Sequence, residues 1–142
     1  AQDVALTGDR LAAIAAAQGT VIGAGDVVLI RTGWAQYWED ATRYINADHG
    51  APAGPGPDLS GARWLSGHGI FAAGSDTVAF ERVPDPDMPV HIHLLFESGI
   101  HIIEALDLEA LARDRVYEFA FVGAPLKLRG GTGAPLRPLA LA

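Results

Sequence analysis

Apolar positions recur along the chain at spacings that predict short helices alternating with short strands. Between Thr7 and Gly19, apolar residues repeat at the i, i+3, i+4 spacing from Leu11 onward, which predicts an amphipathic helix. Thr7 is placed to cap the start of this helix and Gly19 to end it. Residues 25–34 (GDVVLIRTGW) then form a continuous apolar run rich in β-branched residues. That run predicts a buried strand.

The same alternation continues to the end of the chain. Ser60 is placed to cap a second helix, and Gly69 lies just beyond the end of that helix. Asp107 is placed to cap the short helix at 106–114. The remaining predicted elements are a strand at 70–80, a short helix at 91–99 ending with Gly99, a strand at 100–106, the short helix at 106–114 and a strand at 116–124, with Pro/Gly loops at 49–58 and 81–89.

Strands interleaved with helices predict an α/β fold with a mixed sheet and short helices. The chain has 142 residues, the size of one ordinary domain, and about 68–70% of the unfolded surface of such a chain is buried on folding. The loop at 49–58 could be read as a linker between domains, but it is short and its flanking segments resemble parts of one core. We therefore expect residues 1–142 to form a single domain.

Composition narrows the functional classes. Hydrophobic residues make up 49% and charged residues 19% of the chain, as in globular proteins. The net charge of −7 and the lack of a basic run argue against nucleic-acid binding. The sequence contains no cysteine, which excludes disulfides, thiolate metal sites and a cysteine nucleophile. No apolar run reaches the roughly 20 residues that span a bilayer, so we expect no membrane association and a cytoplasmic location.

The start of the chain supports two interpretations. It begins AQDVALTGDR, without methionine and without a basic-then-apolar signal pattern. Ala-Gln-Asp could follow a signal-peptidase cut, or it could be the start of an internal piece.

An aromatic stretch follows the first predicted strand. It contains Trp34, Tyr37, Trp38 and Tyr44. Packing in the core is the more common reason for such a cluster. The alternative is a wall that faces a substrate or another subunit.

The densest group of candidate catalytic residues lies in VHIHLLFESGIHIIEAL, residues 90–106. Metals such as Zn and Mn are held by neutral imidazoles and carboxylates, which converge at about 2.0–2.2 Å from the ion. In a strand, His91 and His93 would point to one face, whereas in a helix they would diverge by about 200°. A histidine near an apolar surface is more often a hydrogen-bonded structural residue, so the pattern alone leaves His91, His93 and His101 equivalent.

Asp76 is a further candidate because it follows a predicted strand, where functional carboxylates often lie. A turn hydrogen bond between Asp76 and its neighbours explains the residue equally well. The sequence contains no G-x-S-x-G nucleophile elbow, no H-E-x-x-H zinc motif and no phosphate-binding P-loop.

Five segments in order resemble the cyclase family of metal-dependent hydrolases, which includes bacterial kynurenine formamidases and isatin hydrolases. They are GDVVLIRTGW, PGPDLSGARWLSGHGI, GSDT, HIHLLFESGIHIIEAL and PLKLRGGTGAPLRPLA, and together they extend over nearly the whole chain. The resemblance implies a swivelling β/β/α-type domain and hydrolysis of the C–N bond of an amide, formamide or small cyclic amide. It also implies one or two divalent metals, Zn or Mn, and a homo- or hetero-oligomer.

The resemblance distinguishes His91 from His93 and His101. The family has a metal-ligating histidine that matches His91 and a metal-ligating glutamate that matches Glu104. His93 and His101 fall on variable positions of the family, which favours packing or surface roles for them. Trp34, Tyr37 and Trp38 are the candidates for contact with the small-molecule substrate.

One part of the family pattern is missing. The family carries an H-x-G-T-H-x-D-x-P-x-H segment that supplies further metal ligands and an acid/base histidine, and this sequence has no match to it. The chain therefore resembles the C-terminal half of the family fold. We expect an N-terminal half or a partner chain to supply the remaining ligands and the acid/base histidine. The alternative is a non-catalytic assembly or small-molecule-binding subunit, which the retention of both His91 and Glu104 disfavours.

Overall fold

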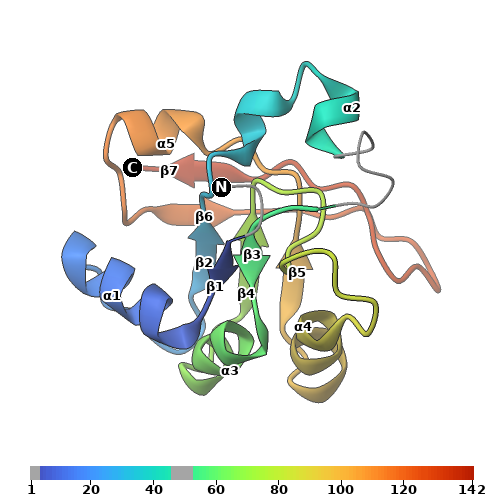
Figure 1. Ribbon diagram of the computed structural model, residues 1–142, viewed down its shortest axis with the longest axis horizontal. Helices are drawn as coiled ribbons and strands as arrows, with labels where there is room; N and C mark the ends of the chain where they lie inside the picture. Colours follow the sequence, from blue (N-terminus) through green and yellow to red (C-terminus); the bar gives the residue numbers. More distant parts are fainter. Residues whose placement is uncertain (1–3, 46–52) are drawn as a thin grey trace.

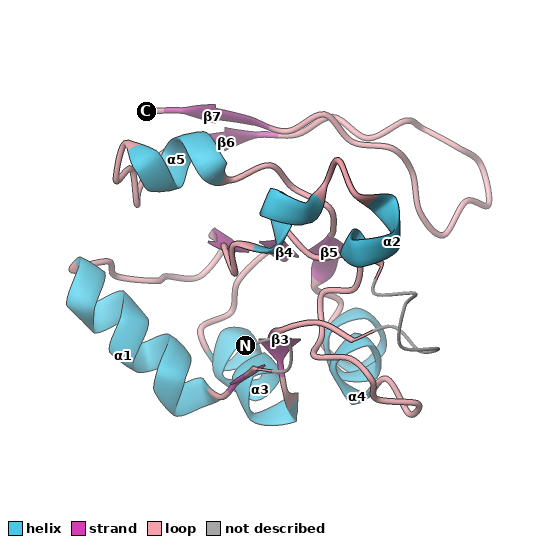
Figure 2. Ribbon diagram, turned by 45° about the horizontal axis from the view of Figure 1, so that its top comes forward, coloured by secondary structure: helices cyan, strands magenta, loops and turns pink. Residues whose placement is uncertain are grey.

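The computed structural model describes residues 4–45 and 53–142 and has three layers (Figures 1 and 2). A parallel sheet of three strands in the order β2-β4-β5 forms the middle layer. Helices α1, α3 and α4 cover one face of this sheet, and α5 and the C-terminal hairpin of β6 and β7 lie on the other side (Figure 2). The expectation of an α/β fold with short helices is confirmed, but the expected mixed sheet is wrong for the described residues, where each sheet is either parallel or antiparallel.

The predicted helices and strands occur in the predicted order and are mostly shorter than predicted, and several further short elements were not predicted. The strands are β1 (Ala5–Leu6), β2 (Val27–Ile30), β3 (Gly56–Pro57), β4 (Ala72–Ser75), β5 (His101–Ile103), β6 (Ala120–Val122) and β7 (Leu139–Leu141). The helices are α1 (Gly8–Gln18), η1 (Trp34–Tyr37), α2 (Ala41–Tyr44), α3 (Leu59–Gly67), α4 (Pro89–His91), η3 (Ile92–Glu97) and α5 (Glu109–Arg113). No described helix is long and apolar enough to cross a membrane.

The sheet brings together three segments that are far apart in the sequence. Ala72 of β4 pairs with Val27 of β2 on one side and with His101 of β5 on the other. All these pairs are parallel, so each connection crosses over the sheet, through α3 in the first case and through α4 and η3 in the second. The residues that follow β4 and β5 therefore lie at the same edge of the sheet.

The first helix follows its predicted caps. The hydroxyl of Thr7 accepts from the backbone N–H of Arg10, and Gly19 adopts a left-handed conformation with φ 71°. Leu11 is buried on the predicted apolar face, whereas Ile14 is 45% exposed. This helix therefore carries apolar surface that the described residues leave uncovered.

The predicted cap of α3 is wrong by two residues. The carboxylate of Asp58, not Ser60, accepts from the backbone N–H of Gly61 at 3.0 Å. Ser60 Oγ instead donates to Asp58 at 2.6 Å and accepts from the N–H of Gly8 at 3.2 Å. Both residue types favour the cap position, so the choice depends on tertiary contacts with α1. Gly69 lies beyond the helix end with φ 67°, as predicted.

The predicted cap of α5 is also displaced. The cap residue is Leu108, and the helix starts at Glu109 rather than near residue 106. Asp107 still contributes, because its carboxylate accepts from the N–H of Glu109 at 3.1 Å. The side chain thus acts from one residue before the cap.

The core lies between the sheet and the helical layer. Leu65 of α3, Phe80 and Leu94 of η3 are fully buried at its centre. The prediction that the strand at 25–34 is buried is wrong in large part, because only Ile30 of β2 is buried. In the described part of the chain β2 forms an edge of the sheet, so it has a neighbouring strand on one side alone.

Two open grooves adjoin the sheet. The first, of about 940 Å³, is bordered by α1, β2 and the residues between Val116 and Phe121. The second, of about 1010 Å³, lies between β5 and the hairpin. Protein interiors contain few voids larger than a water molecule, so these grooves are surfaces that the described residues leave uncovered.

Candidate metal site

The helical segment formed by α4 and η3 separates the two histidines of the HIH motif. The segment runs from Pro89 to Glu97, and Gly99 with φ 66° ends it, as the sequence predicts. In a helix, residues two apart point in different directions. The side chain of His91 accordingly contacts Glu81 and Glu104. The side chain of His93 contacts Ser66 of α3 instead.

His91 and Glu104 come together from different elements. His91 lies in α4, and Glu104 directly follows β5. The distance between His91 Nε2 and Glu104 Oε1 is 3.4 Å. The backbone N–H of Phe80 donates to the same oxygen of Glu104 at 2.9 Å, which fixes the carboxylate. The structure thus places the two predicted ligands side by side.

A third acid, Glu81, completes the cluster from the other side of the ring. Its residue is 1% exposed, and one of its carboxylate oxygens makes a short hydrogen bond with His91 Nδ1. The backbone N–H groups of Val90 and His91 also donate to Glu81, at 3.3 and 3.2 Å. The sequence carries no signal for Glu81, because the residue lies in a proline-rich loop, ten positions before the histidine that it contacts.

The acids change the protonation of the cluster. The hydrogen bond to Glu104 raises the pKa of His91, burial opposes that change, and the bond to Glu81 adds to it. Burial works against ionisation of Glu104, but the bonds from His91 and from the N–H of Phe80 outweigh it and lower the pKa of Glu104. Both shifts favour the charged forms of His91 and Glu104, whereas a cation binds the imidazole only in its neutral form.

The geometry of His91 and Glu104 fits one edge of a metal coordination shell. Two ligands at 2.0–2.2 Å from a tetrahedral ion lie about 3.4 Å apart, and Nε2 and Oε1 are separated by 3.4 Å. Glu81 faces the opposite ring nitrogen and cannot join them. Within residues 4–45 and 53–142, no group of three or more acidic or histidine side chains could hold an ion. The pair thus fits a metal but forms less than a full site.

The other histidines have separate partners. His93 bonds to Ser66 Oγ at 2.9 Å and to Glu97 at 2.7 Å, so Glu97 is paired rather than simply solvated. His101 is exposed and lies edge-on against the ring of Phe71. These contacts agree with packing and surface roles. His49 lies outside the described residues.

The aromatic stretch divides into buried and exposed parts. Trp34 is 5% exposed and donates its indole N–H to the carbonyl of Tyr44 at 2.8 Å, which supports packing for that residue. Trp38 is 59% exposed, and Tyr37 is half-buried against Trp34. No hydrogen bond or ring contact among the described residues joins Trp34, Tyr37 or Trp38 to the His91–Glu104 pair. Their contact with a substrate stays a prediction.

Asp76 has a structural role in this fold. It is fully buried directly after β4, and its carboxylate accepts from the N–H and hydroxyl of Thr32 at 2.8 and 2.7 Å. Its second oxygen accepts from the N–H groups of Gly33 and Trp34 at 2.7 and 2.9 Å. The carboxylate thereby organises the turn that starts η1 and has little remaining capacity for a ligand.

Comparisons with known proteins show the family to which the chain is related. The profile of a family described as putative cyclase matches residues 1–82, more than half of the chain. The chain belongs to this family. It is 32% identical over 143 residues to an isatin hydrolase of Roseibium aggregatum, with 98% of this chain and 53% of that protein covered. It is also 37% identical over 76 residues to a kynurenine formamidase of Bacillus cereus, with 54% and 34% covered.

Solved structures extend the cyclase-family likeness to the fold. A structure described as a novel cyclase superposes with a TM-score of 0.88 and 32% identity over 97% of this chain and 46% of its own. A structure described as a potential metal-dependent hydrolase with cyclase activity has a TM-score of 0.67 and 30% identity, over 96% and 57%. The chain thus spans about half the length of the relatives that it matches.

Proposed function

We propose that this chain is the C-terminal part of a metal-dependent hydrolase that cleaves the C–N bond of an amide, formamide or small cyclic amide. The observation that carries the proposal is the convergence of His91 Nε2 and Glu104 Oε1 at 3.4 Å, with each side chain held by a further hydrogen bond. Similarity to isatin hydrolase and kynurenine formamidase supports this class of substrate. Solved relatives described as metal-dependent hydrolases support the metal.

His91 and Glu104 would hold a divalent cation, Zn or Mn, from this side of the site. When bound, such a cation lowers the pKa of a water molecule toward about 7 and polarises a carbonyl group. The hydrogen bond from the N–H of Phe80 keeps Glu104 turned toward His91. Trp34, Tyr37 and Trp38 remain the proposed substrate-contacting residues, with Trp38 the most accessible of them.

The remaining part of the site would come from outside this chain. Catalytic zinc sites have three protein ligands, whereas the described residues supply two. We infer that an N-terminal half or a partner chain adds the other ligands and the acid/base histidine and completes a swivelling β/β/α-type fold. The chain spans about half the length of its relatives, which leaves room for such a part.

Removal of the metal tests the proposed function directly. Dialysis of the complete protein against a chelator should abolish hydrolysis of formanilide-type and cyclic amide substrates, and addition of Zn²⁺ or Mn²⁺ should restore it. Elemental analysis before and after dialysis checks that the metal itself was removed and returned. Full hydrolysis by metal-free protein would contradict the proposal.

The alternative is a non-catalytic assembly or small-molecule-binding subunit of the same fold. The presence of two ligands rather than three also fits this role. The two functions predict different partner chains. A chain that carries the H-x-G-T-H-x-D segment and assembles with this one supports the enzyme, whereas an assembly without that segment and without metal supports the alternative.

We expect the chain to associate strongly through its uncovered apolar surface. The two grooves adjoin α1, the free edge of β2 and the hairpin, and Ile14, Phe71 and Leu126 are 45%, 57% and 58% exposed. An uncovered strand edge beside apolar surface favours pairing with another chain. Association with the missing half should bury more than about 2,000 Å² in total, as in obligate complexes.

Light scattering coupled to size exclusion checks this expectation. The chain produced alone should elute as oligomers or aggregates, and co-production with the remaining half should give one defined complex. A stable monomer of the chain alone, unchanged by the other half, would contradict the expected docking.

A further inference from the structure

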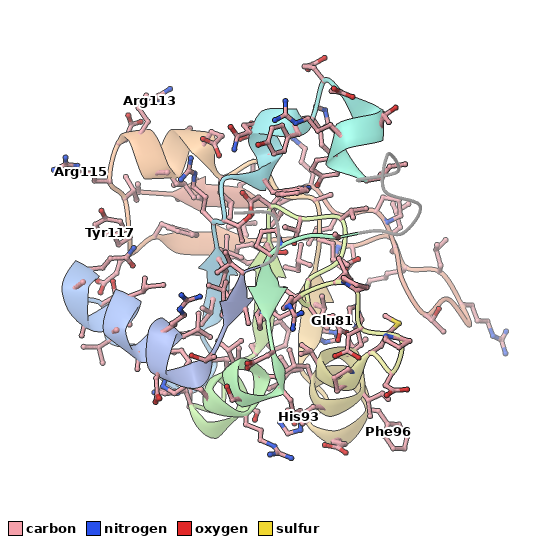
Figure 3. All side chains as sticks on the ribbon, in the orientation of Figure 1. Glu81, His93, Phe96, Arg113, Arg115 and Tyr117 are labelled. Atoms are coloured by element: carbon pink, nitrogen blue, oxygen red, sulfur yellow. The ribbon has the colours of Figure 1, made fainter. Side chains whose placement is uncertain are left out.

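The structure places an acid behind the candidate metal ligand. Glu81 lies inside the molecule beside α4 (Figure 3), and its residue is 1% exposed. One carboxylate oxygen accepts from the N–H of Val90, and the other contacts both the backbone N–H and the ring Nδ1 of His91. The acid therefore holds the start of α4 and the imidazole at the same time.

The backbone around Glu81 is itself held on both sides. The N–H of Arg82 donates to the carbonyl of Pro57 at 3.0 Å, and Gly54 and Val83 exchange two hydrogen bonds of 3.1 Å each. A Cβ atom at Gly56 would lie 2.5 Å from backbone atoms of residues 80–82. This close approach fixes the position from which Glu81 reaches His91.

We propose that Glu81 is a positioning residue that holds the Nδ1 proton of His91 and so leaves the Nε2 lone pair directed at Glu104, where a divalent cation would bind. The inference rests on the proposed metal function. A neutral imidazole carries one proton, and the hydrogen bond made by one nitrogen decides which nitrogen keeps it. With a neutral acceptor at Nδ1, the charged carboxylate of Glu104 would be the stronger acceptor, and the proton would move to Nε2, so that both ligand atoms would be occupied.

The test replaces Glu81 with glutamine, which keeps the volume of the side chain and removes its charge. We expect E81Q in the complete protein to bind Zn²⁺ about 10–100-fold more weakly, the usual effect of losing a partner of a ligating histidine. Competition with a chromophoric chelator measures this dissociation constant. E97Q is the matched control, because Glu97 makes a similar contact with Nδ1 of His93 at 2.7 Å, and it should bind Zn²⁺ as the wild type does.

A second measurement separates positioning from a merely structural role. The ¹⁵N shifts of His91 in metal-free protein at alkaline pH, where the ring is neutral, should report a proton on Nδ1 in the wild type and a shift toward Nε2 in E81Q. Loss of stability alone would not move this proton. Unchanged zinc affinity with the proton still on Nδ1 in E81Q would overturn the proposal, as would a wild-type proton on Nε2.

The two proposals fail in different ways. Wild-type protein that binds no divalent cation would remove the proposed function, whatever Glu81 does. The tautomer measurement needs no metal, so it still decides whether Glu81 orients His91. Weak zinc binding in both E81Q and E97Q would also overturn the positioning role, because the effect would then not be specific to His91.

Discussion

Replacing His91 with alanine is expected to remove the proposed metal and the proposed hydrolase activity from the complete protein. The substitution deletes the Nε2 ligand and also leaves the buried carboxylate of Glu81 without its imidazole partner. Loss of an outer hydrogen-bond partner weakens metal binding by about 10–100-fold, so loss of a ligand itself should cost more than that. Elemental analysis after gel filtration and hydrolysis rates measured side by side check both expectations.

His93 provides a matched control for this experiment. It lies two residues away in the same helical segment, it has a similar side-chain exposure of 16% against 18%, and it also contacts a carboxylate. H93A removes bonds to Ser66 and Glu97 but should leave metal content and activity close to those of the wild type. Equal loss in H91A and H93A would point to general disruption of the helix and would contradict the ligand assignment.

Glu104 should behave as the second member of the pair. E104Q keeps an oxygen that can accept from the N–H of Phe80 but removes the negative charge that a cation needs. We therefore expect loss of metal in E104Q with little loss of stability. Normal metal content in E104Q would show that Glu104 acts by hydrogen bonding alone.

The local sequence pattern predicted which segments form helices and strands better than it predicted the tertiary contacts of those segments. Thr7 and Gly19 act as predicted because a helix cap is satisfied by residues next to it in the chain. The prediction of Ser60 as a helix cap was wrong because Ser60 is engaged by Gly8, 52 residues away, and Asp58 caps the helix instead. The burial of β2 was mispredicted for a similar reason, since an apolar run does not reveal which strand lies at the edge of a sheet.

The candidate site shows the same division. Spacing correctly indicated that His91 and His93 diverge if the segment is helical, but it could not choose between them. Resemblance to the cyclase family selected His91 and Glu104, and the structure places them together. Glu81 had no local signal, because its burial depends on the close approach of Gly56 and on the position of α4. An acid between a predicted strand and a proline-rich loop looks like a solvated residue.

The largest effect on stability is expected at Asp76, for which the sequence left a functional and a structural interpretation open. D76A would remove the acceptor of four hydrogen bonds of 2.7 to 2.9 Å in a site with no exposed surface. Each buried donor left without a partner costs about 1–3 kcal/mol, and D76A leaves several such donors at once. We therefore expect D76A to lower the free energy of unfolding by at least about 3 kcal/mol.

The expected loss of stability in D76A is large because Asp76 connects the end of β4 to the start of η1. Asp40 is the matched control, since its carboxylate also caps a helix, accepting from the N–H of Arg43 at 3.1 Å, but it is exposed. D40A should cost about 0.5–2 kcal/mol, the usual range for a cap. Urea unfolding of the complete protein compares the two, with D76N as a milder variant if D76A fails to fold. Similar losses in the free energy of unfolding for D76A and D40A would contradict the structural role. Asp76 would then again be a candidate functional carboxylate.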